Sequence, residues 1–147
     1  MKNIFIIIAL VLPISSYAFS LFGSFEECVS EKQGGEKGFQ TLYRCIVKYE
    51  EDLPQSTLKN IKGKAEMDDR NDKLKISYKN ENADWRVTRI RVSVTIDGVS
   101  SEYSSEMTYA QPFERTRTWA KIRDVNADVI KDWSWRVVGG KGVYVDD

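Results

Sequence analysis

Apolar and polar residues alternate most regularly between positions 85 and 96. From 90 to 96 every second side chain is an apolar Ile or Val, with polar residues between them, as in a strand with one buried face. Residues 79–84 are rich in Asn and Asp, which favour turns, and positions 74, 76 and 78 ahead of them are again apolar. We therefore expect 74–79 and 85–96 to form an antiparallel pair, and Asp97-Gly98 to close the second strand with a hairpin turn.

Two helices are predicted ahead of the strands. Ser24 and Glu27 have the spacing of a capping box, in which each side chain accepts a backbone N–H at a helix start, so a first helix should begin at Phe25. A second helix should stop before Pro54, because a proline cannot continue it. Its apolar stripe has the spacing of a helix face and consists of Phe39, Leu42, Ile46, Tyr49 and Leu53.

Short strands and turns are expected in the rest of the chain. The patterns favour strands from about position 60, where a short helix at 55–64 is the alternative, and at 103–109, 113–123 and 133–140. The acidic run 68–72 lacks the Gly and the later Glu of an EF-hand calcium loop, so we interpret it as a solvated turn.

The first 18 residues have the composition of a secretory signal peptide. A short basic start is followed by apolar residues at 4–12 and by small residues at the cleavage positions Ser16 and Ala18, so cleavage should follow Ala18. The apolar run is well short of the roughly 20 residues that a membrane-spanning helix needs. We therefore expect an exported protein, periplasmic or alternatively secreted, with no transmembrane anchor after cleavage.

The two cysteines of the chain are Cys28 in the first predicted helix and Cys45 in the second. Export to an oxidising compartment makes a disulfide between them the default. Two short helices have little apolar surface to hold each other, and a bridge would add about 3 kcal/mol by the loop-entropy estimate. A redox CxxC role is the alternative, but the spacing does not fit it.

These elements predict an α+β protein with three regions. A signal peptide at 1–18 would precede an N-terminal disulfide-linked helical hairpin at 19–54. An antiparallel β-sandwich domain of immunoglobulin-like layout would follow at 55–147, since six or so short strands follow one another without helical crossovers.

Three segments carry a resemblance to known proteins. The run 78–88 (YKNENADWRVT), the Pro112-Phe113 step and the closing run 133–142 (WSWRVVGGKG) resemble small exported proteobacterial proteins of unknown function. The resemblance implies a Cys-bearing helical start and a β domain similar to the FxLYD-type immunoglobulin-like modules of bacterial surface proteins. Residues 93–98 (SVTIDG) only approximate the FxLYD signature, and the resemblance implies no catalytic residues.

Composition narrows the possible chemistry. The chain has no His, which excludes His general bases, Ser-His-Asp triads and His metal sites. With both cysteines paired, no thiol remains as a nucleophile. Paired carboxylates such as Glu26 and Glu27 stand in charged runs that are typical of solvated faces. We therefore expect no enzyme, no cofactor and no metal site, and the balance of 22 basic and 22 acidic residues gives no attraction to nucleic acid.

Two kinds of binding remain open. As an interaction module, or as a periplasmic inhibitor or immunity-type protein, the chain would engage another envelope protein through aromatic and Arg hot spots. As a binder of anionic envelope groups such as lipid phosphates, it would use the basic and aromatic strand 113–123, with two arginines of 85–96 if the strands adjoin. A solvated basic strand, with its Trp lying partly over the core, is the alternative. The candidate residues are Arg115, Arg117, Trp119, Lys121, Arg123, Arg89, Arg91, Trp85 and Tyr109.

Overall fold

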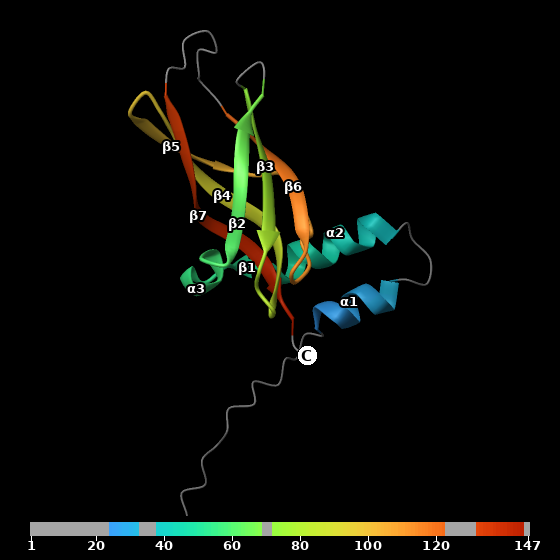
Figure 1. Ribbon diagram of the computed structural model, residues 1–147. Helices are drawn as coiled ribbons and strands as arrows, with labels where there is room; N and C mark the ends of the chain where they lie inside the picture. The colour runs from blue at the N-terminus through green and yellow to red at the C-terminus, as the bar shows by residue number, and fades with distance from the viewer. Residues whose placement is uncertain (1–23, 33–37, 69–71, 123–131, 146–147) are drawn as a thin grey trace, which may run out of the picture.

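The computed structural model describes residues 24–32, 38–68, 72–122 and 132–145, and the predicted signal peptide lies outside this part. The described chain is α+β as predicted, with two helices first and mainly antiparallel strands after them (Figure 1). In chain order the elements are α1 Phe25–Lys32, α2 Gly38–Tyr49, β1 Glu51–Asp52, α3 Gln55–Leu58, β2 Ile61–Met67, β3 Lys73–Asn80, β4 Trp85–Ile96, β5 Val99–Ser104, β6 Arg115–Lys121 and β7 Trp133–Tyr144.

Helix α1 begins with the predicted capping box. The backbone N–H of Glu27 donates to the Ser24 hydroxyl at 3.1 Å, and the backbone N–H of Ser24 donates to the Glu27 carboxylate at 2.9 Å. Two N–H groups that a helix start leaves unpaired are thereby satisfied. The predicted start at Phe25 is confirmed, and that side chain is buried.

Helix α2 exists where predicted, but both ends of its expected buried stripe are wrong. Phe39 is 80% exposed, and the helix ends at Tyr49. The chain continues as β1, and the N–H of Leu53 donates to the carbonyl of Gly140 in β7 at 3.0 Å. Strand pairing therefore displaces the last helical turn, and Leu53 enters the core of the strands. The buried residues of α2 are Thr41, Cys45 and Ile46.

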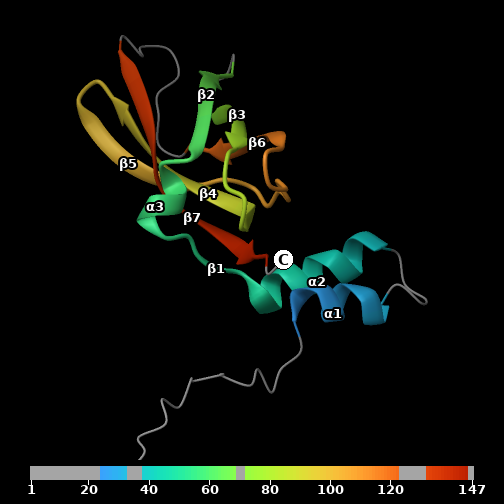
Figure 2. The same ribbon diagram turned by 60° about the horizontal axis from the view of Figure 1, so that its bottom comes forward.

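Cys28 and Cys45 form the predicted disulfide, with Cα atoms 5.8 Å apart. The bridge joins α1 to α2, and both cysteines are buried in a cluster with Phe25, Ile46 and Val143 of β7. The two helices lie side by side at the end of β7 (Figures 1 and 2). The helical hairpin therefore packs on the strands through its disulfide.

The strands form two antiparallel sheets that share one apolar core. One sheet has the order β1-β7-β4-β5 and the other the order β2-β3-β6, which lies in front in Figure 1. The predicted alternation is confirmed, because Val92 and Val94 of β4 and Leu74 and Ile76 of β3 are all buried in this core. β1 pairs with β7, so the first sheet takes in residues ahead of position 55.

The predicted pairing of 74–79 with 85–96 is wrong. β3 pairs with β2 and β6, whereas β4 pairs with β5 and β7, so the connection 81–84 crosses between the sheets. Buried Asn80 explains the crossing, because its side-chain oxygen accepts hydrogen bonds from Asn82. Its amide nitrogen donates to the carbonyls of Trp85, Ala110 and Gln111.

The predicted hairpin turn between β4 and β5 is confirmed. Asp97 and Gly98 have φ values of 48° and 86°, in the left-handed region that such a turn requires. The ladder then begins with Ile96 opposite Val99.

Residues 105–110 link the two sheets by hydrogen bonds. The N–H of Ser105 donates to β4 at 2.8 Å, and the N–H of Glu106 donates to β6 at 2.9 Å. The strand expected over 103–109 therefore ends at Ser104, where the chain leaves the edge of one sheet to bridge to the other.

Arg86 of β4 fastens the helical hairpin to the strands. Its guanidinium forms an ion pair with Glu26 of α1. It also lies 5.6 Å from the ring centroid of Phe25 and 5.9 Å from that of Tyr109, within the range of cation–π attraction. One side chain therefore holds α1 against both β4 and the 105–110 segment.

Candidate functional site

The outer face of the β2-β3-β6 sheet carries a dense group of cations, which we call the basic face. Side chains alternate between the core and the outside along each strand. Of the eleven outward side chains, eight are Lys or Arg and one is acidic. They are Lys62, Lys64 and Glu66 of β2, Lys73, Lys75, Ser77 and Lys79 of β3, and Arg115, Arg117, Trp119 and Lys121 of β6.

Strand pairing places like charges opposite one another on the basic face. Lys79 of β3 lies between Lys62 of β2 and Arg115 of β6 in one row across the sheet. Lys73 faces Lys121 in another row. Opposed like charges destabilise a sheet by up to about 1 kcal/mol for each pair. Folding alone does not favour this arrangement.

Glu81 offsets part of the charge at one end of the basic face. Its carboxylate lies 3.0 Å from the Lys62 ammonium and 3.5 Å from that of Lys79. The hydrogen bond and the charge of Lys62 lower the pKa of Glu81, against a smaller effect of desolvation. Lys64 is 3.5 Å from Glu66. Within the described residues, no ion pair involves Lys73, Lys75, Arg115, Arg117 or Lys121.

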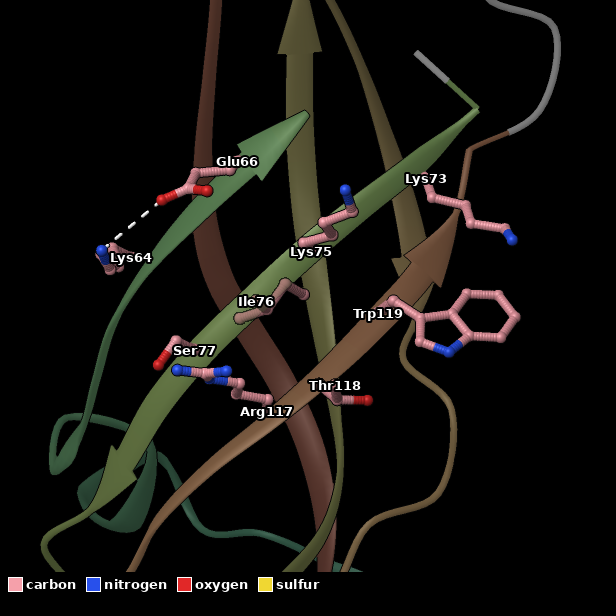
Figure 3. Close-up of a pocket in the computed structure, with 9 residues that line it drawn as sticks. All are labelled: Lys64, Glu66, Lys73, Lys75, Ile76, Ser77, Arg117, Thr118 and Trp119. Carbon is pink, nitrogen blue, oxygen red and sulfur yellow. Dashed lines mark ion pairs between the residues drawn. The ribbon is translucent and has the colours of Figure 1, made fainter. Parts of the chain in front are cut away.

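An open hollow of about 680 Å³ lies at the centre of the basic face (Figure 3). Ser77 is the shortest outward side chain, and its two cross-strand neighbours, Lys64 and Arg117, are long. Figure 3 shows the Arg117 guanidinium reaching across β3 to lie beside the Ser77 hydroxyl. Lys75 and Trp119 form the next row of the lining. The hollow therefore lies over the short Ser77 side chain, between long basic side chains.

Trp119 forms one side of this hollow. The sequence left open which side of its strand faces the core, and the structure buries Thr118 and Ala120 and turns Trp119 outward, where it is 38% exposed. The Lys73 ammonium lies 5.0 Å from the centre of the indole ring. The indole thus holds a cation at the rim of the hollow.

Arg89 and Arg91 belong to the other sheet and do not join the basic face. Arg89 lies 3.5 Å from Glu50, which follows α2, and Arg91 lies 3.5 Å from Glu102 of β5. Each therefore has an acidic partner, whereas Arg115 and Arg117 of β6 have none within the described part of the chain.

The remaining candidates lie away from β6. Trp85 packs edge to face on Tyr144 of β7, with ring centroids 5.4 Å apart. Tyr109 packs on Phe25 at the junction with the helical hairpin, where burial raises its pKa. Arg123 lies outside the described residues. Among the candidates that the structure describes, it thus brings together Arg115, Arg117, Trp119 and Lys121 and leaves the others apart.

The lysines of β2 and β3 were missing from the sequence-based candidates, although a signal for them exists. Basic residues occupy every second position in the run 62–64 and at 73, 75 and 79, the same period that identifies the buried faces. Each run alone resembles the solvent-exposed face of an ordinary strand. Only the adjacency of β2, β3 and β6 shows that they form one surface.

The chemistry available to the basic face is the binding of anions. Ammonium and guanidinium groups donate charge-assisted hydrogen bonds to phosphate and carboxylate oxygens. Over the described ranges, no three His, Cys, Asp or Glu side chains gather so as to hold a metal ion. None of the described helices is long and apolar enough to cross a membrane.

Comparisons of the chain with protein-family models, with curated proteins and with solved structures found no match. The function is therefore inferred from the basic face itself.

Proposed function

We propose that the protein is an exported, non-enzymatic binding module that attaches to anionic groups of the cell envelope, lipid phosphates in particular, through the basic face. The opposition of Lys73 to Lys121 carries the proposal, because neither lysine has an acidic partner within the described residues and the pair costs stability in the free protein. An anionic surface removes that cost by supplying the missing counter-charge.

The expected gain from binding an anionic surface is larger than the expected cost of the opposed like charges in the free protein. A Lys or Arg close to an anionic membrane gains about 1 kcal/mol. Opposed like charges within a sheet cost about 0.2–1 kcal/mol for each pair. Eight cations on one sheet face can approach a surface together, so the gain on binding exceeds the cost borne in the free state.

Export and the absence of catalysis are parts of this proposal. The Cys28–Cys45 disulfide supports export, because such bonds persist in oxidising compartments. The lack of His in the chain and the pairing of both cysteines support a binding role rather than an enzymatic one.

We also propose that the two sheets form a β-sandwich of immunoglobulin-like layout, as the resemblance to FxLYD-type modules implies. What supports this is the single apolar core between Ile76 on one sheet and Val94 on the other. Measuring the angle between the sheets in a crystal structure tests it, since aligned sandwiches cross at about 30°.

Vesicle binding tests the proposed function. The protein should co-sediment with phosphatidylglycerol vesicles at low salt, bind phosphatidylcholine vesicles far less, and lose affinity as salt rises. Arg115→Glu should weaken the binding about tenfold or more, since it reverses a charge worth about 1 kcal/mol at the surface. Arg136→Glu, an exposed arginine of β7 on the other sheet, is the matched control and should change little. Equal effects of the two variants, or equal binding to both lipids, would overturn the proposal.

An envelope protein is the second candidate partner, favoured by a stripe on α2. Phe39, Tyr43 and Val47 lie one turn apart and are 80%, 45% and 50% exposed. Exposed aromatic side chains in one stripe are typical of protein contacts. A photo-crosslinking residue at Tyr43 should give one discrete adduct in cells, and the same residue at exposed Ser100 of β5 should give none.

A further inference from the structure

We infer that the hollow around Ser77 is a site for one phosphomonoester group, such as the terminal phosphate of a lipid headgroup. The inference rests on the proposed function, because it assigns a ligand class to the centre of the same basic face. It goes further in separating one built site from the general attraction of the surrounding charges.

Three kinds of hydrogen-bond donor, namely ammonium, guanidinium and hydroxyl groups, line the hollow. Lys64 and Arg117 stand directly opposite Ser77 on the two neighbouring strands, and cross-strand partners have Cβ atoms about 4.5–5.5 Å apart. Lys75, which also lines the hollow, stands two residues before Ser77 on β3, about 7 Å away along the strand. Long side chains span such distances, so all of these groups can reach an anion above Ser77.

The hydroxyl of Ser77 and the guanidinium of Arg117 lie beside each other at the hollow (Figure 3). Arg117 reaches over β3 to the side of Ser77, and the hydroxyl of Ser77 is a donor on the floor of the hollow (Figure 3). A guanidinium fork donates two parallel hydrogen bonds to two oxygens of one phosphate. The hydroxyl and an ammonium then remain for a third oxygen.

This number and direction of donors favours a phosphomonoester over other anions. A phosphomonoester has three free oxygens and a charge between about −1.5 and −2 at neutral pH. A carboxylate has two oxygens and a phosphodiester has two free ones, each with a single charge. The monoester alone has a third free oxygen for the hydroxyl and an ammonium once the fork has bound two.

Glu66 is the competitor for this site. It lines the hollow, pairs with Lys64 at 3.5 Å and faces Lys75 across the β2-β3 ladder. An incoming dianion replaces this carboxylate as the partner of Lys64. Glu66→Gln should therefore raise affinity for the monoester more than for a diester, because the ammonium is released at the hollow.

The test compares two vesicle types adjusted to the same surface potential, one with phosphatidic acid as the monoester and one with phosphatidylglycerol as the diester. The protein should bind the phosphatidic acid vesicles about tenfold more tightly, the gain expected from one added charge-assisted hydrogen bond. Equal affinity for the two would overturn the inference while leaving the proposed function intact. Failure to bind either would overturn the proposed function itself.

Ser77→Lys separates a built site from general attraction. The added charge should strengthen binding to phosphatidylglycerol, whereas filling the hollow should abolish the preference for phosphatidic acid. A variant that gains affinity for both lipids and keeps the preference would overturn the inference. Arg117→Lys keeps the charge and removes the fork, so it should lower the preference for phosphatidic acid over phosphatidylglycerol.

A second pair of variants separates loss of the hydroxyl from an effect of the substitution on folding. Ser77→Thr keeps the hydroxyl and should keep the preference, whereas Ser77→Val has nearly the same shape without it and should lose it. Equal preferences in these two would overturn the role of the hydroxyl.

Competition by glycerol 3-phosphate at constant ionic strength identifies the source of the monoester. Displacement from phosphatidic acid vesicles assigns the site to the phosphate group itself. Retention, with the lipid preference intact, assigns it to a membrane-borne headgroup.

Discussion

Lys73 lies directly opposite Lys121 across the β3-β6 ladder, and both side chains are exposed on the same face. Lys121→Thr should therefore stabilise the protein by a few tenths to about 1 kcal/mol, because it removes opposed like charges and adds a residue that favours strands. Urea denaturation at low salt measures the gain, which should shrink at high salt as the charges are screened.

Lys62→Thr provides the control for that prediction. Lys62 faces Lys79 but also pairs with Glu81 at 3.0 Å, so its removal loses an attraction along with a repulsion. A stabilisation as large as that of Lys121→Thr would contradict the like-charge argument.

Removing the disulfide should destabilise the hairpin of α1 and α2. The double variant Cys28→Ser with Cys45→Ser frees a loop with a sequence separation of 17 residues, for which the chain-entropy estimate is about 3 kcal/mol. Hydrogen exchange should show earlier loss of protection in α1 than in β4, since β4 is held by two neighbouring strands. Equal loss of protection in the two elements would mean that the hairpin and the sheets unfold as one unit.

Asn80 should be among the most sensitive polar positions. It is fully buried, and its amide nitrogen lies 2.6 Å from the Trp85 carbonyl and 3.1 Å from that of Ala110. Asn80→Leu keeps the volume but removes the side-chain hydrogen bonds to these carbonyls and leaves the buried backbone N–H of Asn82 without its acceptor, so we expect a loss of about 3 kcal/mol or more. Asn60→Leu, at an exposed position with one side-chain bond at 3.1 Å, should cost less than about 1 kcal/mol. Similar losses of stability for the two variants in urea denaturation would contradict the special role of the buried Asn80 side chain.

Tyr78 should make the protein less stable in strong alkali. Burial raises the pKa of Tyr78 to about 12, although the hydrogen bond with Thr108 at 3.0 Å acts in the opposite direction. Between pH 10 and 12 the unfolded chain loses this proton while the folded protein keeps it, so the free energy of unfolding falls with rising pH. The two-unit shift corresponds to about 2–3 kcal/mol over that window.

Tyr78→Phe isolates this effect from other groups that titrate in alkali. The free energy of unfolding of the wild type should fall by about 2–3 kcal/mol relative to that of the variant from pH 10 to pH 12. Parallel stability curves in urea denaturation across that range would contradict the raised pKa.

Features of the fold that depend on near neighbours in sequence were predictable. The capping box needs only Ser24 and Glu27, and the burial of Val92 and Val94 in β4 follows from alternation, which does not predict the burial of Ser93 between them. The disulfide followed from the expected compartment and from the count, since the chain has two cysteines and so offers a single pair.

Features that depend on distant partners were not predictable from local pattern. The partners of Asn80 lie as far as 31 residues along the chain, so its Asn-rich run indicated a turn without showing which strands it joins. Leu53 fits a helical stripe equally well, and only its bond to Gly140 assigns it to the sheet. The candidate site was found in one strand of three, because the adjacency of β2, β3 and β6 decides what Lys64 and Arg117 can do together.

The concentration of cations on one face makes the charge distribution of the molecule asymmetric. The whole chain has 22 basic and 22 acidic residues, so eight cations and one acid on the basic face leave an excess of negative charge on the rest. Such a separation is a permanent electric dipole. In the field of an anionic surface the dipole turns the molecule before contact. The basic face therefore arrives first, and the acidic remainder is held away from the surface.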